Sequence, residues 1–156
     1  MRIIAFIGIA LLYLLSSCER GEHEIIVVPE NYKGHFVVIF NVKTGKPRKY
    51  SGKTRIYEIP SNGILKTQFS GNYGWLDYAE FYRGNITASN RLPISFELKR
   101  VPDYLIVGVM GSTGIQRKDL IGNDLYEYAE FYIGTRLEID SLRQVSEQTD
   151  ITRLAK

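Results

Sequence analysis

The stretch His35-Phe36-Val37-Val38-Ile39-Phe40-Asn41-Val42 decides the fold class of this chain. Its apolar residues are nearly continuous and include several β-branched ones, which is typical of a strand that is buried on both faces. Turn residues border the stretch on each side, at Asn31–Gly34 and at Lys43–Pro47. The stretch therefore predicts a central strand of a sheet.

Further short runs of β-forming residues follow one another at spacings of about ten residues, with glycine and proline between them. The predicted strands are Glu24–Val28, Thr54–Ile59, Ile64–Phe69, Trp75–Tyr82, Ile94–Leu98, Tyr104–Met110 and Tyr126–Ile133. Loops are predicted at Gly111–Gly114 and Gly122–Asp124. The pattern predicts an all-β fold, an antiparallel β-sandwich of the transthyretin or immunoglobulin type. An α/β fold is disfavoured because no helical stretch lies between the strands.

One turn has a specific chemistry. Asn62-Gly63 tolerates positive φ and separates two of the predicted strands, Thr54–Ile59 and Ile64–Phe69. This arrangement predicts a β-hairpin whose turn sets the register of both strands.

The end of the chain changes its periodicity. Thr135 and Glu138 have the spacing of a capping box, and Ile139, Leu142 and Val145 then recur every three residues. The pattern predicts a short helix from about Leu137 to Glu147, followed by a frayed tail over residues 150–156. We expect residues 25–149 to form one domain that includes this helix.

The beginning of the chain resembles the signal of a bacterial lipoprotein. Arg2 precedes an apolar run, and Leu15-Ser16-Ser17-Cys18 has the lipobox order of an aliphatic residue, two small residues and a cysteine. The apolar run is shorter than the ~20 residues of a transmembrane helix. The alternative is an ordinary secretory signal with a cysteine near its cleavage site. The resemblance implies that residues 1–17 are removed and that Cys18, the only cysteine, is acylated, for example with palmitate.

Acylation would anchor the protein to a membrane without a spanning helix, because two or three acyl chains together bind a bilayer stably. Residues 18–24 would then form a short polar tether. We expect a lipid-anchored protein of the cell envelope. The outer membrane is favoured because Glu19 is not the aspartate associated with inner-membrane retention in some bacteria.

The formal charge of +3 is small for 156 residues, and nucleic acid is not an expected partner of an exported protein. One basic cluster lies between Lys43 and Arg55. It fits either attraction to anionic lipid or polysaccharide, or a solvated hairpin tip.

Residues 25–70 resemble an uncharacterised family of bacterial lipoproteins, known as domain of unknown function 6843. The motifs that carry the resemblance are Pro29-x-x-Tyr32-x-Gly34, Phe40-Asn41, Gly45-x-Pro47 and the run from Arg55 to Phe69, and Phe131–Thr135 is similar to a later segment. The resemblance implies an envelope lipoprotein. It implies no catalytic residue.

A near-repeat, Tyr-Ala-Glu-Phe-Tyr, begins at Tyr78 and again at Tyr128. Because strand side chains alternate, Phe81 and Phe131 should be buried, and Glu80 and Glu130 should face solvent. The outward face is either an ordinary polar sheet surface or an aromatic platform for sugar rings or a cationic group. The candidate ligand surface comprises Trp75, Tyr78, Glu80, Tyr82, Tyr126, Tyr128, Glu130 and Tyr132.

Few residues suggest catalysis. Glu80 and Glu130 are an acid–base pair for glycoside hydrolysis only if their carboxyls lie ~5–9.5 Å apart. His23 and His35 have no spacing that completes a zinc site, and no nucleophile elbow or P-loop occurs. We therefore expect no catalytic residue, metal or cofactor.

The sequence favours a membrane-anchored binding or scaffolding module whose partner is an envelope protein or a glycan. Two alternatives remain open. One is a carbohydrate-active enzyme that uses Glu80 and Glu130, and the other is an assembly subunit of an envelope machine.

Overall fold

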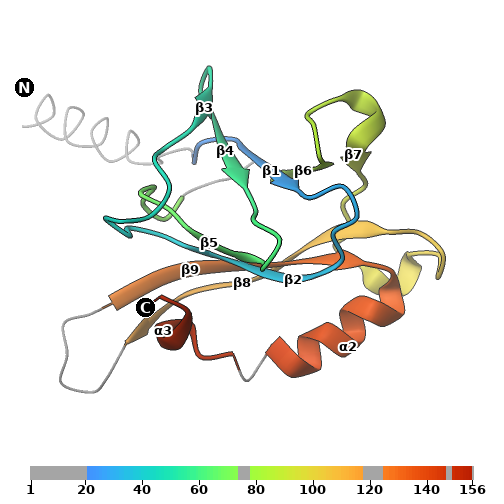
Figure 1. The fold of residues 1–156 in the computed structure, drawn as a ribbon. Coiled ribbons are helices and arrows are strands. Elements are labelled where there is room, and N and C mark those ends of the chain that lie inside the picture. The colour runs from blue at the N-terminus through green and yellow to red at the C-terminus, as the bar shows by residue number, and fades with distance from the viewer. Residues whose placement is uncertain (1–20, 74–77, 118–124, 147–148, 156) are drawn as a thin grey trace, which may run out of the picture.

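The computed structural model describes residues 21–73, 78–117, 125–146 and 149–155. Within these ranges, nine strands form two sheets, and two helices lie against one of them (Figure 1). The first sheet has the order β3-β4-β1-β6-β7 and the second β5-β2-β9-β8. The strands are β1 Glu24–Val28, β2 Gly34–Ile39, β3 Tyr50–Ser51, β4 Thr54–Glu58, β5 Ile64–Lys66, β6 Glu80–Arg83, β7 Arg91–Leu92, β8 Val107–Arg117 and β9 Leu125–Gly134. The helices are α2 Arg136–Ser146 and α3 Ile151–Leu154, with 3₁₀ turns at Ala88–Asn90 and Leu98–Arg100.

Both sheets are mixed, so the prediction of purely antiparallel pairing is wrong. β1 pairs in parallel with β4 and β6, and β2 pairs in parallel with β5. The remaining pairs, such as β2 with β9 and β8 with β9, are antiparallel. The parallel pairs arise because the chain leaves the first sheet after β1, forms β2 in the second sheet, and then returns for β4 in the direction of β1.

The predicted hairpin at Asn62-Gly63 is also wrong, although its turn exists. The Gly63 amide donates to the Pro60 carbonyl at 2.9 Å, and Gly63 has a φ of +74°. The turn does not join neighbouring strands, because β4 belongs to the first sheet and β5 pairs with β2 in the second. The positive φ therefore serves a crossing between the two layers.

Two other local predictions need correction. Ile94–Leu98 is no strand: Ile94 makes a single bridge to Gly108, and the chain enters a 3₁₀ turn at Leu98. Gly111–Gly114 is no loop, because β8 continues through it with a bulge between Met110 and Thr113. Trp75 and the predicted loop at Gly122–Asp124 lie outside the described residues.

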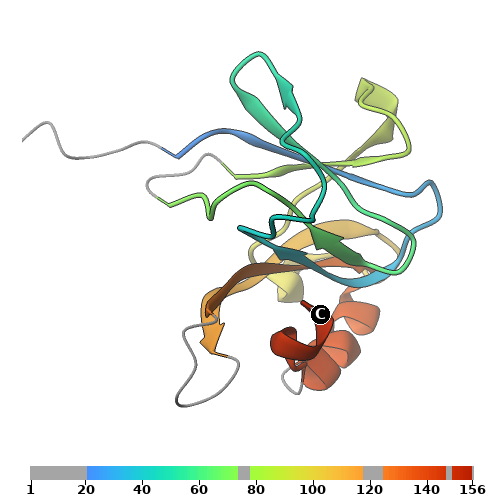
Figure 2. The same ribbon diagram turned by 60° about the vertical axis from the view of Figure 1, so that its left-hand side comes forward.

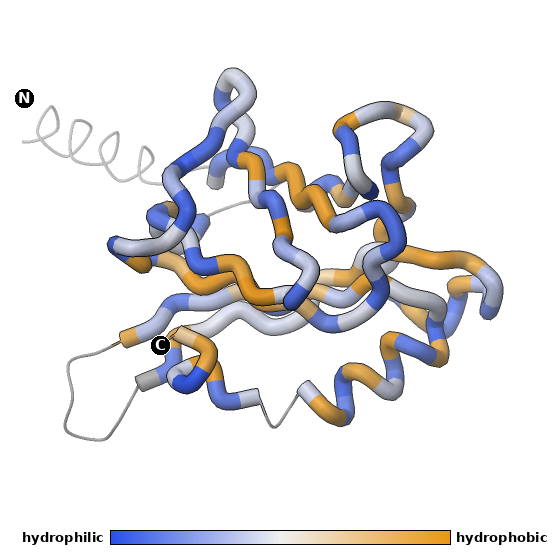
Figure 3. The backbone as a smooth tube through the Cα atoms, viewed as in Figure 1, coloured by the Kyte–Doolittle hydropathy of each residue, from blue (hydrophilic) through white to orange (hydrophobic). Residues whose placement is uncertain are grey.

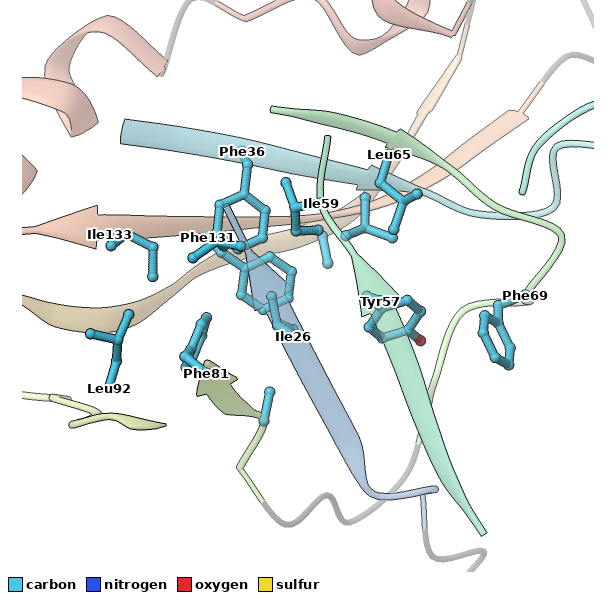
Figure 4. Packing of buried hydrophobic residues seen from close by; sticks show 14 of the residues in the cluster. Ile26, Phe36, Tyr57, Ile59, Leu65, Phe69, Phe81, Leu92, Phe131 and Ile133 are labelled. Atoms are coloured by element: carbon cyan, nitrogen blue, oxygen red, sulfur yellow. The ribbon is translucent and has the colours of Figure 1, made fainter. Parts of the chain in front are cut away.

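The core lies between the two sheets, which face each other (Figure 2). Figure 4 shows Phe36 and Phe131 side by side in it, with ring centroids 5.1 Å apart. The first sheet contributes Ile26, Val28, Tyr57 and Phe81, and the second contributes Phe36, Val38, Leu65 and Phe131. The prediction that β2 is buried on both faces is confirmed, because Val37 and Ile39 are buried under α3 on its other side.

The helices form a third layer on the outer face of the second sheet. The predicted capping box is present, since the Thr135 amide donates to the Glu138 carboxylate at 2.8 Å. Figure 3 shows α2 alternating between apolar and polar residues. Ile139 is fully buried, but Val145 is 71% exposed, so its predicted place on the buried face is wrong. The frayed tail is also wrong: the short helix α3 buries Ile151 against Val37 and Ile39.

The start of the described chain is fixed to the domain more firmly than a tether would be. The Glu22 carboxylate accepts from the guanidinium of Arg55, and the Glu22 amide donates to the Asn72 side chain at 3.0 Å. Arg55, the last residue of the basic cluster, is buried. Lys53 of the same cluster lies at the tip of the β3–β4 hairpin and is exposed, as expected of a solvated turn. Cys18 and the lipobox lie outside the described residues. No helix among the described residues is long and apolar enough to cross a membrane.

Candidate functional site

Strand β9 carries the second copy of the repeated segment. The side chains of this copy that point to the outer face line a polar cleft. The cleft lies where α2 ends and α3 approaches the second sheet, and its volume is about 520 Å³. Its lining residues are Met110, Gly111, Ser112, Gln116, Tyr128, Glu130, Tyr132, Arg143, Ser146 and Thr149. The cleft therefore combines hydroxyl, amide, carboxylate and guanidinium groups.

Glu130 lies at the floor of this cleft and is only 8% exposed, so its predicted exposure is wrong. Its Oε1 lies 3.2 Å from Nε2 of His35, and its Oε2 accepts a hydrogen bond from the Ser112 hydroxyl. Burial acts to raise the pKa of this carboxyl, but the hydrogen bonds from His35 and Ser112 outweigh it and hold the pKa below its ordinary value. Glu130 is therefore a buried carboxylate at neutral pH.

The bulge in β8 places Ser112 against Glu130. Between Met110 and Thr113 the register with β9 shifts, which redirects the intervening side chains. A Cβ atom at Gly111 would lie 2.7 Å from the ring of Tyr132 and 2.9 Å from the carbonyl oxygen of Glu130. Only glycine fits so close to β9, and this close approach brings the next residue, Ser112, to the carboxylate.

Tyr132 joins the sheet to α2 beside the cleft. Its hydroxyl lies 2.6 Å from the Ser146 hydroxyl, which in turn donates to the Arg143 carbonyl. The Tyr132 ring stacks on His35 with centroids 5.1 Å apart, and the Arg143 guanidinium lies 5.7 Å from the ring centroid. These contacts fix the Arg143 side chain at the cleft wall through a cation–π interaction.

The first copy of the repeat lies on the opposite outer face. Glu80 is partly buried on the first sheet, where its carboxylate lies 3.5 Å from His23 and 3.1 Å from Arg91 and accepts from the Tyr82 hydroxyl at 2.5 Å. Three neighbouring groups thus engage Glu80. The two copies of the repeat do not combine into one surface.

The remaining members of the predicted ligand surface are dispersed. Tyr82 and Tyr132 are buried, and Tyr126 packs against the cluster beneath α3, so these three do not form an exposed platform. Tyr78 is 59% exposed and contacts Phe96, with ring centroids 4.1 Å apart. Trp75 lies outside the described residues.

The prediction for the two phenylalanines is confirmed, since Phe81 and Phe131 are both buried. Seven of the ten residues that line the cleft, and His35 beside Glu130, were not predicted as site residues. Ser112 lies in a glycine-rich segment that is typical of a loop, His35 reaches Glu130 only through the pairing of β2 with β9, and Arg143 lies on the polar side of a predicted helix. No group of three or more potential metal-binding side chains occurs within the described ranges.

Residues 20–141 match the model of a family described as "Family of unknown function (DUF6843)". No curated protein matches the chain. A crystal structure from Bacillus anthracis, described as a "putative lipoprotein", resembles the fold with a TM-score of 0.52. The match covers 83% of this chain and 97% of that one at 13% sequence identity, so the two share a fold.

Proposed function

Since the chain belongs to the family of unknown function DUF6843, we propose its role from its own residues: a lipid-anchored binding module of the bacterial envelope. The two sheets with one shared core support classing the domain as a β-sandwich. The Bacillus anthracis protein described as a "putative lipoprotein" supports the envelope location.

The anchor in this proposal is an acyl group on Cys18. The lipobox Leu15–Cys18 motivates it. Because Glu22 is already bonded to Arg55 and Asn72, only a few residues separate the anchor from the folded domain. Four residues reach about 14 Å when extended, so the domain would lie close to the membrane surface. More specifically, we propose the outer membrane, because Glu19 is not the aspartate associated with inner-membrane retention in some bacteria.

The ligand in this proposal is a glycan of the envelope, bound in the polar cleft. The observation that carries it is the buried Glu130 carboxylate at the cleft floor, held by Ser112 and His35. A carboxylate has about four acceptor sites, so Glu130 retains the capacity to accept from sugar hydroxyls. Arg143 on the wall disfavours a cationic ligand and can donate to a sugar oxygen or an acidic sugar.

An array of bacterial envelope glycans, probed with the full-length chain in detergent, tests this proposal. The wild-type chain should be retained by at least one glycan class. Arg143→Glu should lose that retention, because it places a second negative charge beside Glu130. Arg153→Glu is the matched control, since Arg153 is an exposed arginine of α3 that does not line the cleft. No retention, or equal retention by both variants, would reject the cleft as a glycan site.

The geometry does not support the hydrolase alternative with Glu80 and Glu130 as a pair. The phenylalanines that follow these residues meet in the core between the sheets, so the two carboxylates point to opposite outer faces. Of the described residues that line the cleft, Glu130 is the only carboxylate, and its lowered pKa does not suit a general acid. That the chain is no enzyme of another kind stays a prediction.

The edge of β8 favours the assembly alternative. β8 is the last strand of its sheet, and past Gly108 its outer edge pairs with no strand in the described part of the chain. Ile115 on this edge is 59% exposed, which is typical of a strand that can accept another. Crosslinking in intact cells from a photoreactive group at residue 115 tests it. Capture of one envelope protein would support assembly, and no crosslinked product would reject it.

A further inference from the structure

A second, smaller cavity lies between the two sheets, at the end where β1 begins. Its volume is about 230 Å³. Most of the surface that lines it is apolar, and Phe40, Met110, Ala129 and Phe131 supply much of it. Glu24 is the one acidic side chain among its described lining residues. The cavity lies on the inner side of the second sheet and the polar cleft on its outer side, because Glu24 and Phe131 belong to the face of each sheet that points inward; Met110 and Tyr128 border both.

Glu24 has a buried carboxyl that makes no direct ion pair with a described residue. Glu24 is 6% exposed, and its Oε1 accepts a hydrogen bond from the Tyr57 hydroxyl at 2.9 Å. No ion pair joins Glu24 to a described residue. The nearby Arg55 is already engaged by the Glu22 carboxylate and by the Ser70 carbonyl at 2.7 Å. Burial raises the pKa of the Glu24 carboxyl, although hydrogen bonds from Asn72 and Tyr57 and the charges of Arg55 and His23 oppose the rise.

The loop that forms one wall of this cavity is held in place before any ligand arrives. The Asn72 side chain donates to the Glu22 carbonyl at 2.7 Å and accepts from the Glu22 amide at 3.0 Å. The adjacent Gly71 amide donates to the Glu127 carboxylate at 3.0 Å. A preformed wall of this kind lowers the cost of ordering on binding. The cavity therefore has the features of a ligand site, an apolar volume with one fixed polar group.

We propose that this cavity binds a small organic amine, with its ammonium group on Glu24 and its apolar body against Phe40, Met110 and Phe131. One observation favours a cation over a neutral ligand. The buried carboxylate has no ion-pair partner among the described residues, and an ammonium group would supply both the missing charge and hydrogen-bond donors. The cavity volume limits the body of the ligand to about the size of one aromatic ring, because a cavity of about 150 Å³ already admits benzene.

Benzylamine and benzyl alcohol are suitable probes, since they share a body and differ in charge at pH 7.5. Met110 is one of two methionines in the chain, so a ¹³C-methyl methionine label gives a simple spectrum. Met110 borders both the cavity and the polar cleft, so the Glu24→Gln variant described below assigns its shift to the cavity. The full-length labelled chain in detergent is titrated with each probe. Benzylamine should shift the Met110 methyl signal with a Kd at least tenfold lower than that of benzyl alcohol.

Glu24→Gln should abolish this preference, because it keeps a polar partner for Tyr57 and removes the charge. Glu58→Gln is the matched control at an exposed carboxylate, and it should leave both affinities unchanged. Ala129→Leu, which adds volume to the cavity wall, should weaken the binding of both probes. The proposal is overturned by equal affinity of the wild-type chain for the two probes, by the absence of any shift, or by an amine preference that survives in Glu24→Gln. None of these results would bear on the proposal that the polar cleft binds a glycan.

Discussion

The rings of Phe81 and Phe131 meet edge to face between the two sheets, with centroids 5.9 Å apart. Each follows a glutamate of the repeated segment, so the repeat supplies both sheets with a core residue at the same place. Because neighbouring strand residues alternate in direction, this contact sends Glu80 and Glu130 to opposite sides of the molecule. Both copies of the repeat therefore supply residues to the core, and only the second copy borders the polar cleft.

Replacing either phenylalanine with alanine should destabilise the domain by about 3–5 kcal/mol, because each loss leaves a cavity in the core. Tyr78→Ala is the control from the same repeat, and as an exposed position it should change the free energy of unfolding by less than about 1 kcal/mol. Chemical denaturation of the three variants measures the difference. A Phe81→Ala variant as stable as Tyr78→Ala would contradict the core assignment.

Substitutions at Gly63 and Gly52 distinguish the cost of backbone strain from the cost of a steric clash. Both have positive φ, but a Cβ atom at Gly63 would lie 2.5 Å from the Tyr32 hydroxyl and 3.0 Å from the His35 carbonyl, whereas Gly52 has open space. Gly52→Ala should cost about 1 kcal/mol from backbone strain alone, and Gly63→Ala should cost more. Denaturant midpoints decide this. Equal midpoints for the two variants would exclude a steric role for the crossing turn.

Glu138 should make the stability of α2 depend on acid. Hydrogen bonds from Lys33 and from the Thr135 amide lower its pKa to about 2 from an ordinary value of 4.5. Since the folded pKa is the lower one, its stabilising contribution is complete above about pH 4.5 and is lost as the pH falls towards 2. The difference in melting temperature between the wild type and Glu138→Gln should therefore shrink over that window. A difference that stays constant from pH 7 to pH 2 would refute the assignment.

Cys18→Ser tests the anchor. The variant should either appear in the soluble fraction or remain as an uncleaved precursor, because a serine cannot carry the thioether-linked lipid. Cell fractionation with mass measurement of the product distinguishes these forms. A cleaved Cys18→Ser protein that stays fully in the membrane fraction would show that another part of the chain is the anchor.

The strands that the sequence predicted well are those with strong local patterns, such as β1, β2, β4 and β9. The pairing of β2 with β5 was not predictable in this way, because it depends on a chain that crosses between layers. The continuation of β8 was missed because Gly111 and Ser112 have the composition of a loop, and only the approach to Tyr132 explains them.

The candidate site was predicted only in part, because local sequence patterns do not reveal contacts between distant segments. The repeat identified Tyr128 and Glu130, since both lie on one strand and alternate with core residues. The burial of Glu130 was missed, because it is produced by groups distant in sequence, His35 on β2 and Ser112 on β8. Arg143 enters the cleft only because α2 packs on the outer face of the second sheet.

The most direct test of the account is to map the glycan on the protein. Amide chemical shifts of the full-length ¹⁵N-labelled chain are recorded while the glycan retained on the array is added. We expect the largest shifts at Ser112, Arg143 and Thr149 around the cleft, and no change at His23 and Arg91 beside Glu80. Shifts concentrated around Glu80 and absent from the cleft would contradict this expectation.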